Sequence, residues 1–422
     1  MSGGHGLIIA APGSGSGKTT VTLGLLRALR DKGVNVRGAK SGPDYIDPRF
    51  HEAASGAVCM NLDAWAMTPA RVRSLAAGDG LMIIEGAMGL FDGAPPDGKG
   101  ACADLARMLG LPVVLVVDAA HVAQSVAPLV AGFARHDPRV KVAGVILNKV
   151  GSDRHERMLR MSLDPIGIPV LGALRRETGI EHPSRHLGLV QADERPDLQE
   201  FLKLVSEQVR QAVDLDALQE LAAPLPGAGP QVGMPPPAQR IAIARDEAFA
   251  FAYPHLLRDW RTAGAELSFF SPLADEAPGP ADLVILPGGY PELHAGRIAA
   301  AENFRAGMLR AKEVYGECGG YMVMGQTLTD ANGAGHQMLG LLNLRTNFQK
   351  RRLHLGYRSL TAKAGPFSGQ YSAHEFHYAT TELAKGDSLF SARDAENNDL
   401  GPMGLRQGKS CGSFAHLIDV IR

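Results

Sequence analysis

The chain has little cysteine, no long apolar run and almost no net charge. Its four cysteines lie far apart without a Cys-x-x-Cys pair, which argues against a zinc site or disulfide framework and favours a reducing compartment. No apolar run reaches the roughly 20 residues of a membrane helix, and the N-terminus does not resemble a signal peptide. The 43 lysines and arginines nearly balance the 44 aspartates and glutamates, so the net charge is too small to attract nucleic acid. We therefore expect a cytoplasmic protein whose partners include neither nucleic acid nor a membrane.

The 422 residues exceed the size at which one core usually stops growing, which predicts two domains. Short runs rich in Val, Ile and Leu recur in the first half, with helix-like segments such as residues 19–30 between several of them. This alternation predicts βαβ units around a parallel sheet that is buried on both faces. The expected strands are residues 7–10, 81–84, 113–117 and 142–147.

A change of composition divides the chain. After an amphipathic stretch, residues 222–238 are rich in proline, glycine and alanine, which predicts an extended and poorly packed linker. Strand-like runs then resume at residues 241–244, 267–270, 283–286 and 313–315. The predicted fold class is α/β throughout, with one domain at residues 1–221, the linker at 222–238 and a second α/β domain at 239–422.

A glycine-rich loop follows the first predicted strand and opens a helix. It reads PGSGSGKTT from Pro12, so its first glycine comes one place later than in the standard phosphate-loop pattern. Such a loop turns backbone N–H groups toward phosphate oxygens, and its lysine reaches the outer phosphates. The strand and helix around it favour a nucleotide site over a flexible Gly/Ser turn. The residues expected to hold ATP are Gly13, Ser14, Gly15, Ser16, Gly17, Lys18, Thr19 and Thr20.

Polar residues are expected at the same edge of the sheet. Glu85 ends the strand at residues 81–84, where P-loop folds place their acidic metal partner. Asp44 belongs to residues 40–47, which follow a further strand predicted after the helix at residues 19–30. These two acids and the Thr19 hydroxyl are the predicted Mg²⁺ ligands. Lys40 either faces the γ-phosphate or is a surface lysine, and Asn148 either reads a purine base or caps a turn. The alternative for Glu85 and for Asp92 is that both are ordinary acids of a glycine-rich loop.

A single cysteine in the second half has the surroundings of a nucleophile. The run YGECGGY from Tyr315 puts Cys318 beside glycines directly after a predicted strand, which is a thiol version of the nucleophile elbow. The helix that follows is expected to lower the pKa of the thiol. The alternative is a buried structural cysteine, which is the role expected of Cys59, Cys102 and Cys411.

The other parts of a glutaminase site are also present. Gly288 and Gly289 follow the strand at residues 283–286, and their N–H groups can form an oxyanion hole for amide hydrolysis. His416 is the preferred general base, with His374 and His377 as rivals. Spacing alone does not separate them, because such partners meet only in the fold.

In combination and order, these motifs resemble the cobyrinate or hydrogenobyrinate a,c-diamide synthases of cobalamin biosynthesis. The resemblance spans nearly the whole chain; the N-terminal half is similar to dethiobiotin synthetase and the C-terminal half to class I glutamine amidotransferases. It is carried by residues 12–19, 40–48, 85–93, 286–292, 316–322 and 374–378.

The resemblance implies a ligase that amidates the a- and c-acetate carboxylates of a corrin acid through acyl phosphates, with ammonia from glutamine. ATP and glutamine are then co-substrates, Mg²⁺ the cofactor, and a homodimer a possible assembly. It implies that Thr19, Asp44 and Glu85 bind Mg-ATP, and that Cys318 and His416 are the glutaminase nucleophile and base. The residues implied to border the corrinoid are Tyr45, Asp47, Glu85 and Asp92.

One departure from the family pattern concerns the third triad residue. Class I glutaminases carry a glutamate two residues after the histidine, and here that position is Ile418. The third member is therefore absent or comes from elsewhere, with Glu375 as either its replacement or a structural acid.

Two other functions remain open at this point. The same chemistry can act on another tetrapyrrole, such as a nickel sirohydrochlorin, or on several corrin side chains. A P-loop scaffold of the partitioning ATPase type is a different class, but such proteins carry an additional lysine where this chain has Gly13, and they need no cysteine elbow.

Overall fold

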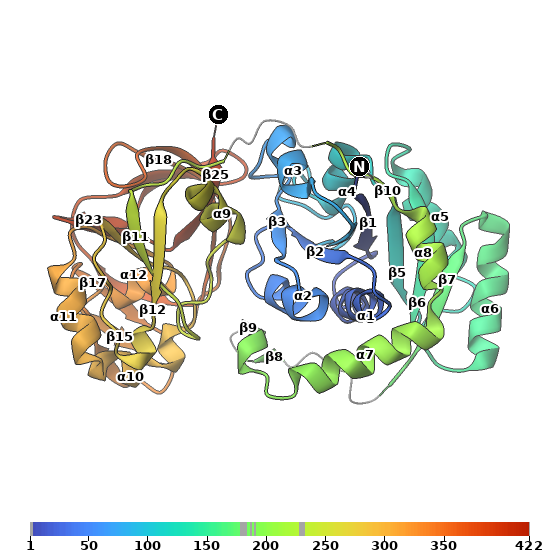
Figure 1. Cartoon of the computed structure of the whole chain (residues 1–422), viewed down its shortest axis with the longest axis horizontal. Coiled ribbons are helices and arrows are strands. Elements are labelled where there is room, and N and C mark those ends of the chain that lie inside the picture. Colours follow the sequence, from blue (N-terminus) through green and yellow to red (C-terminus); the bar gives the residue numbers. More distant parts are fainter. Residues whose placement is uncertain (1–2, 178–183, 186–187, 190, 228–232, 422) are drawn as a thin grey trace. The chain divides into compact units, whose positions relative to one another are not determined.

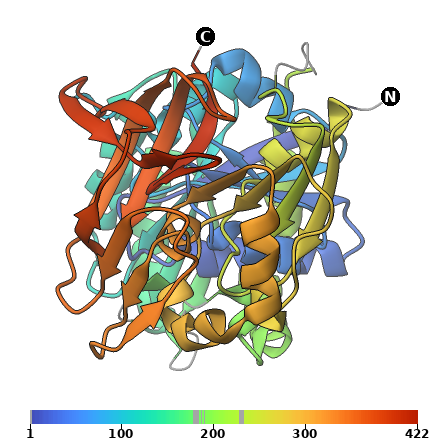
Figure 2. The same cartoon turned by 90° about the vertical axis from the view of Figure 1, so that its left-hand side faces the viewer.

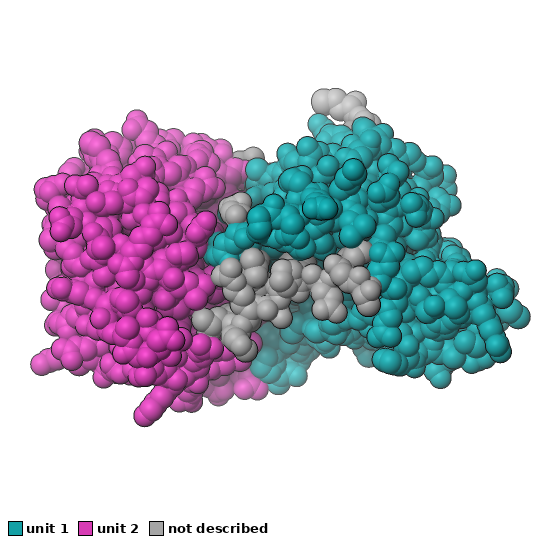
Figure 3. Space-filling view, turned by 90° about the horizontal axis from the view of Figure 1, so that it is seen from below, with its two compact units in different colours: residues 1–232 teal, residues 233–422 magenta. Residues whose placement is uncertain are grey.

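The computed structural model describes residues 3–177, 184–185, 188–189, 191–227 and 233–421 (Figure 1). The chain forms two compact units, Met1–Val232 and Gly233–Arg422, which Figure 3 shows in two colours. In the described part of the chain, no helix is long and apolar enough to cross a membrane.

Unit 1 is built on a parallel sheet with the strand order β3-β2-β4-β1-β5-β6-β7. Its helices lie on the two faces of this sheet (Figure 1). The strands are β1 (His5–Ala10), β2 (Val36–Ser41), β3 (Met60–Leu62), β4 (Leu81–Glu85), β5 (Val113–Asp118), β6 (Val142–Val150) and β7 (Val170–Arg175). The helices are α1 (Lys18–Asp31), α2 (Asp47–Ser55), α3 (Pro69–Ala76), α4 (Cys102–Leu109), α5 (Val126–His136), α6 (Asp153–Leu163), α7 (Leu198–Ala212) and α8 (Leu215–Leu221).

Burial explains why these apolar runs form the centre of a parallel sheet. Strands β1, β4 and β5 are buried along nearly their whole length, as expected when helices cover both faces. Helix α1 packs against α7, and a Cβ at Gly24 would lie only 2.5 Å from the Val209 side chain. Since β1 is the central strand, its C-terminal end opens at the edge where α/β proteins bind ligands.

The beginning of the predicted linker is part of unit 1. Strand β10 (Ala223–Pro224) pairs antiparallel with β1, and the Leu225 N–H donates to the Gly4 carbonyl. Met234 is buried, and residues 228–232 lie outside the described residues. The expected poorly packed segment is thus anchored at its start.

Unit 2 contains a second sheet, ordered β12-β11-β13-β14-β24-β23, in which only β23 runs antiparallel to its neighbour. The strands are β11 (Arg240–Ala244), β12 (Glu266–Phe270), β13 (Leu283–Leu286), β14 (Val314–Glu317), β23 (Leu405–Gln407) and β24 (Ser410–Ser413). The helices are α9 (Pro254–Thr262), α10 (Ala295–Ala300), α11 (Glu302–Arg310) and α12 (Gly319–Val323). The predicted α/β class is confirmed for both halves.

Two further sheets of unit 2 have no counterpart among the predicted strands (Figure 2). An antiparallel sheet is ordered β22-β21-β18-β19-β25, and a smaller mixed sheet β16-β15-β17-β20. The first contains β18 (His354–Ala362), β19 (Gly369–His377), β21 (Phe390–Arg393), β22 (Asp399–Met403) and β25 (Ala415–Val420). The second contains β15 (Thr327–Thr329), β16 (Gly335–Gln337), β17 (Leu344–Asn347) and β20 (Thr380–Ala384).

Candidate active sites

The glycine-rich loop of unit 1 connects β1 to α1 and is braced from a distant strand. Gly15 and Gly17 have φ values of 79° and 83°, which glycine adopts without strain. The Asn148 side-chain amide donates to the Ser16 carbonyl at 2.9 Å and would meet a Cβ at Gly17. Asn148 thus braces the loop, which is neither of the two roles expected for it, and its amide oxygen accepts from the Lys149 N–H at 2.9 Å; the purine role stays a prediction.

The Lys18 ammonium lies inside the loop. Its Nζ donates to the Met88 carbonyl at 2.6 Å and lies 3.4 Å from the Gly13 carbonyl. Burial lowers the pKa of Lys18, because few groups there replace the water that would solvate its charge. Met88 has a positive φ of 50°, which is strained for a residue with a side chain. A buried cation held by carbonyls is suited to an anionic ligand.

An ion cluster lies at the carboxyl ends of β2 and β4. The Thr19 hydroxyl donates to Glu85 Oε1 at 2.6 Å and lies 3.4 Å from Asp47 Oδ2. Lys40 Nζ lies 2.5 Å from Asp47 Oδ2 and 2.8 Å from Glu85 Oε1. Burial alone would lower the pKa of Lys40, but the two carboxylates hold it well above its ordinary value. Lys40 is buried, so it is not the surface lysine that the sequence left open.

His51 belongs to this cluster, although no motif in the sequence marks it. Its Nε2 lies 2.6 Å from Glu85 Oε2, while its Nδ1 lies 3.5 Å from the Cys59 sulfur. Burial raises the pKa of Glu85, but Lys40 and His51 outweigh it and keep the pKa below its ordinary value. Glu85 is therefore an ionised carboxylate with a fixed orientation.

The other predicted acids have more ordinary contacts. Asp44 Oδ1 accepts from the backbone N–H groups of Ile46 and Asp47, at 2.8 and 3.1 Å, and its Oδ2 lies 3.8 Å from Lys40 Nζ. Burial and the neighbouring Asp47 raise the pKa of Asp44 to about 6. Tyr45 is half-buried beside it, and the exposed Asp92 closes a turn by accepting from the Gly89 N–H at 2.9 Å. Asp47 and Glu85, rather than Asp44, thus lie closest to Thr19.

These oxygen atoms fit a hard divalent cation. Asp47 Oδ1 is buried without a hydrogen-bond partner among the described residues, so one carboxylate oxygen remains available beside the Thr19 hydroxyl. Mg²⁺ prefers such carboxylate and hydroxyl oxygens together with phosphate oxygens of a substrate.

In unit 2, the predicted cysteine elbow has the expected backbone strain. Cys318 lies between β14 and α12 with φ 45° and ψ −106°. A Cβ at Gly320 would lie 1.9 Å from the Leu286 carbonyl oxygen, and one at Gly319 would lie 3.0 Å from the Gly289 nitrogen. The two glycines therefore let the elbow pack directly on the loop after β13.

Gly288 lies between the predicted nucleophile and the preferred base. A Cβ at this position would lie 2.1 Å from His416 Cε1 and 3.2 Å from Cys318 Cβ. His416, on β25, is buried; burial, followed by the nearby His374 and His377, lowers its pKa to about 3. An imidazole that is neutral at pH 7 can accept a thiol proton.

The prediction that the pKa of the Cys318 thiol is lowered is wrong. Burial raises the pKa of Cys318, with the carboxylate of Glu292 as the next cause, and the Gly319 N–H opposes it only weakly. Helix α12 has five residues, so its dipole is small. Glu292, on the loop after Gly289, has a pKa raised by burial to about 8, and its Oε2 is buried without a hydrogen-bond partner in the described structure.

The rival histidines have other surroundings. His374 lies opposite His416 in the β19–β25 pair, and burial lowers its pKa to about 4. His377 stacks on Phe414 with ring centroids 3.9 Å apart. Glu375 accepts from Arg358 Nε at 2.8 Å and lies 3.1 Å from His377 Nε2. Its ion-pair partners are thus Arg358 and His377, and not His416.

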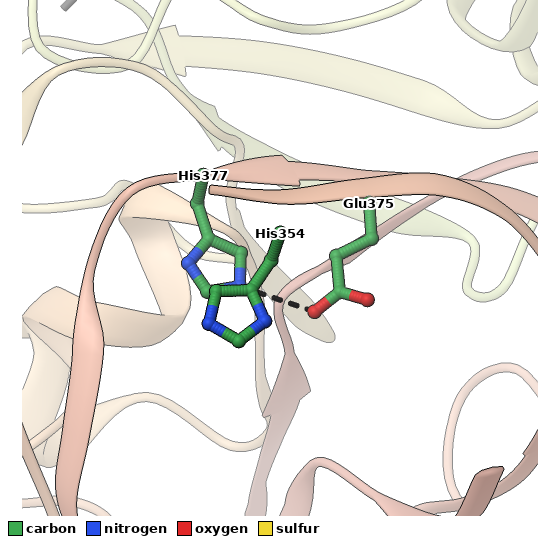
Figure 4. A group of neighbouring side chains, drawn as sticks. All are labelled: His354, Glu375 and His377. Carbon is green, nitrogen blue, oxygen red and sulfur yellow. Dashed lines mark hydrogen bonds and ion pairs between the residues drawn. The ribbon is translucent and has the colours of Figure 1, made fainter. Parts of the chain in front are cut away.

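His354, Glu375 and His377 also lie at distances seen in metal sites, since one ligand atom from each is within 4.8 Å of the others (Figure 4). The two imidazole rings, however, stack with centroids 4.6 Å apart and planes only 6° apart. Ring nitrogens bind metals in the plane of the ring, so two stacked rings do not direct their lone pairs at one ion. The Arg358 guanidinium already pairs with the carboxylate. The cluster is therefore better described as a stacked histidine pair.

Both units match known families. Residues 7–190 match the CobQ/CobB/MinD/ParA nucleotide binding domain, and residues 240–419 match the CobB/CobQ-like glutamine amidotransferase domain. Hydrogenobyrinate a,c-diamide synthases of Brucella anthropi and Rhizobium meliloti are each 55% identical to this chain, over 98% of it and 98% and 99% of their own lengths. This chain belongs to the hydrogenobyrinate a,c-diamide synthase family.

The family relationship extends to more distant members. The hydrogenobyrinate a,c-diamide synthase of Mesorhizobium japonicum is 50% identical over 98% of each chain. Two solved structures, a glutamine amidotransferase and a chloroplast FtsY of Physcomitrella patens, match with TM-scores of only 0.23 and 0.31 and support no conclusion here. The family accounts for both sites: a nucleotide-binding unit and a glutaminase unit occur in one chain, in the predicted order.

Proposed function

We propose that this chain is a glutamine-dependent ligase that uses ATP to amidate the a- and c-acetate carboxylates of hydrogenobyrinate. The observation that supports this most is the full-length similarity to hydrogenobyrinate a,c-diamide synthases in a chain that carries both a phosphate loop and a cysteine elbow. We assign amide synthesis to residues 1–221 and glutamine hydrolysis to residues 239–422, with residues 222–238 between them.

The synthase reaction follows from the chemistry of a carboxylate, whose oxide is a poor leaving group. Transfer of the γ-phosphoryl group of ATP to an acetate oxygen gives an acyl phosphate, and ammonia then attacks its carbonyl carbon and displaces inorganic phosphate. The loop N–H groups and Lys18 hold the phosphates and stabilise the charge that develops on them.

Mg²⁺, when bound, neutralises phosphate charge during transfer, and Thr19, Asp47 and Glu85 are the residues placed to hold it. Asp44, assigned to the ion from the sequence, acts in this proposal through the cap that fixes Asp47. Lys40 fixes the two carboxylates, and His51 orients Glu85 from the opposite side.

Glutamine hydrolysis uses the neutral pair in unit 2. His416 accepts the Cys318 proton, the thiolate attacks the side-chain amide carbon, and the proton then passes to the departing ammonia. Backbone N–H groups at Gly288 and Gly289 are the proposed oxyanion hole. Water hydrolyses the thioester to glutamate and restores the thiol.

The acceptor site is proposed to lie beside the ion cluster of unit 1. Tyr45, Asp47, Glu85 and Asp92 are proposed to border the corrinoid, since they lie around the ion cluster and the loop after β4. The names of the relatives favour the cobalt-free corrin acid over cobyrinate or a nickel sirohydrochlorin. A homodimer and a cytoplasmic location remain predictions.

The test is mass spectrometry after incubation of the full-length protein with Mg-ATP, glutamine and one acceptor at a time. Hydrogenobyrinate is expected to gain two amides, with one ADP and one glutamate formed for each. Diamidation of nickel sirohydrochlorin instead would replace the acceptor assignment. ATP hydrolysis without amide formation on any tetrapyrrole would favour the partitioning ATPase alternative.

A further inference from the structure

The position at which class I glutaminases carry their third triad residue cannot supply an acid here. That position is Ile418, which is buried on β25. Its backbone carbonyl lies 2.9 Å from His255 Nε2, so the strand is fixed there by an unrelated contact. Since Glu375 pairs with Arg358 and His377, an acid that supports His416 has to come from another element.

Glu317, the residue before the nucleophile, lies beside the other nitrogen of the base. Its Oε2 is 3.7 Å from His416 Nδ1, within ion-pair distance, whereas His416 Cε1 and Nε2 lie against Gly288 next to Cys318. Catalytic hydrogen bonds are often long in a ligand-free enzyme and shorten when substrate binds. The ring therefore has Gly288, which adjoins Cys318, beside Nε2 and a carboxylate beside Nδ1.

Two hydrogen bonds fix the Glu317 carboxylate in this position. Its Oε1 accepts from the Leu417 N–H at 3.1 Å and from the Tyr315 hydroxyl at 3.2 Å. Because Leu417 directly follows His416 on β25, the same contact ties the acid to the strand of the base. The geometry leaves Oε2 directed at the imidazole.

The surroundings of Glu317 are otherwise apolar, and in the described structure its ion-pair partner is His416. A narrow cavity beside it is lined mainly by apolar and aromatic residues from α9, β11, β13 and the segment around Phe367. The Glu317 side chain is only 13% exposed. A buried acid without a permanent cation is costly to maintain, and such groups occur mainly where a charge appears during function.

We propose that Glu317 is the positioning residue of the glutaminase site and replaces the missing third member of the triad. It holds the His416 ring with Nε2 toward Cys318 and stabilises the imidazolium that forms when Nε2 takes the thiol proton. The Nδ1 proton stays on His416 throughout, and the carboxylate remains ionised.

A pH dependence follows from this role. Burial raises the pKa of Glu317 to about 7, and its hydrogen bonds to Leu417 and Tyr315 only partly oppose this. The titratable groups that face it are Tyr315 on its own strand, the adjacent Cys318, His416 on β25 and Tyr253 in the cavity. Since only the carboxylate can support the imidazolium, glutaminase kcat is expected to rise with pH through about 7.

The experiment compares Glu317→Gln, Glu317→Asp and the matched control Glu313→Gln, all in the full-length protein. Glutaminase kcat, the KM for glutamine and the pH profile are measured, with ammonium-dependent amidation as the check on unit 1. Glu317→Gln, which keeps the Leu417 hydrogen bond, is expected to lose kcat by about 10- to 100-fold, with KM little changed and the rise near pH 7 absent. Glu317→Asp is expected to restore part of kcat and the rise.

Three results would overturn the proposal: wild-type kcat in Glu317→Gln, a lower kcat with the rise near pH 7 retained, or an equal loss in Glu313→Gln. Glu375→Gln tests the competing assignment. The proposal requires that this variant keep the pH profile, and loss of the rise in Glu375→Gln alone would transfer the role to Glu375. None of these outcomes depends on the corrinoid, so they are separate from a failure of the proposed ligase function.

Discussion

The two sites of this chain differ in charge: the site in unit 1 holds buried ion pairs, and the site in unit 2 holds neutral groups. In unit 1, Lys40 lies buried between the carboxyl groups of Asp47 and Glu85, and Lys18 is a second buried lysine nearby. In unit 2, burial keeps the Cys318 thiol protonated and the His416 ring neutral, so the reacting pair carries no charge at rest.

The difference follows from when charge arrives at each site. ATP brings several negative charges on binding, so a cluster of fixed and mutually paired ions can receive them without reorganisation. Glutamine has a neutral side-chain amide, and an ion pair is needed only while the thiol reacts. A thiolate and an imidazolium kept permanently in an apolar site would be costly, so the thiol and the imidazole stay neutral until the thiol reacts.

The largest effect is expected from a substitution in the charged site of unit 1. Lys18→Ala removes a cation whose importance grows as the γ-phosphoryl group transfers, so amidation with either glutamine or ammonium should fall by roughly 100- to 1,000-fold. Amide formation with each nitrogen source is the measurement, and Lys32→Ala, on the exposed end of α1, is the matched control. Ordinary ammonium-dependent turnover would exclude Lys18 from the chemistry.

The next prediction concerns a substitution that affects only the neutral site of unit 2. Cys318→Ser should reduce glutamine-dependent amidation by about 100-fold or more, because serine is a far weaker nucleophile without a stronger base. Amidation with high ammonium should remain, since phosphorylation resides in unit 1. Cys411→Ser, in a buried cysteine outside the elbow, is the control. Loss of both activities in Cys318→Ser would contradict the separation of the two sites.

A third comparison divides the acids of unit 1. Glu85→Gln and Asp47→Asn should weaken Mg-ATP use by about 10- to 100-fold, since both carboxylates lie beside Thr19. Exposed Asp92→Asn should leave Mg-ATP use unchanged and slow the second amidation, so that the singly amidated product accumulates. Mg-ATP titrations and product mass spectra check this. If all three variants behave like wild type, the acceptor site lies elsewhere.

The smallest expected effect concerns the contact behind Glu85. His51→Gln should raise the Mg²⁺ concentration that gives half-maximal activity by about 10-fold, because Glu85 loses its orienting partner. His121→Gln, at an exposed position, serves as the control. An unchanged Mg²⁺ requirement in a folded His51→Gln protein would mean that Lys40 alone fixes Glu85.

The sequence reveals features that are local in the chain. The phosphate loop and the cysteine elbow are each encoded within a few consecutive residues between a strand and a helix, so Lys18 and Cys318 could be placed in advance. Most of the parallel strands could be predicted for the same reason, because buried central strands read as continuous apolar runs; β3, β7 and β24 were missed.

Features made by distant segments could not be predicted. His51 reaches Glu85 across 34 residues, and Glu317 reaches Leu417 across 100, without a spacing that marks either pair. Strand β18 is half-buried over most of its length, and β19 alternates only toward its C-terminal end, which is a weak signal beside an apolar run. The pKa of Cys318 was predicted in the wrong direction, because burial is invisible in a local motif and outweighs a five-residue helix.

The tight packing around Gly288 makes its codon sensitive to mutation. Every glycine codon becomes an alanine codon by a single base change, and a methyl at this position would lie 2.1 Å from His416 Cε1. Such an allele would separate base from nucleophile yet leave the coding sequence of unit 1 untouched, so its product would still accept free ammonium. A single base change at this codon is therefore expected to remove the use of glutamine, and growth on abundant ammonium would tolerate such an allele.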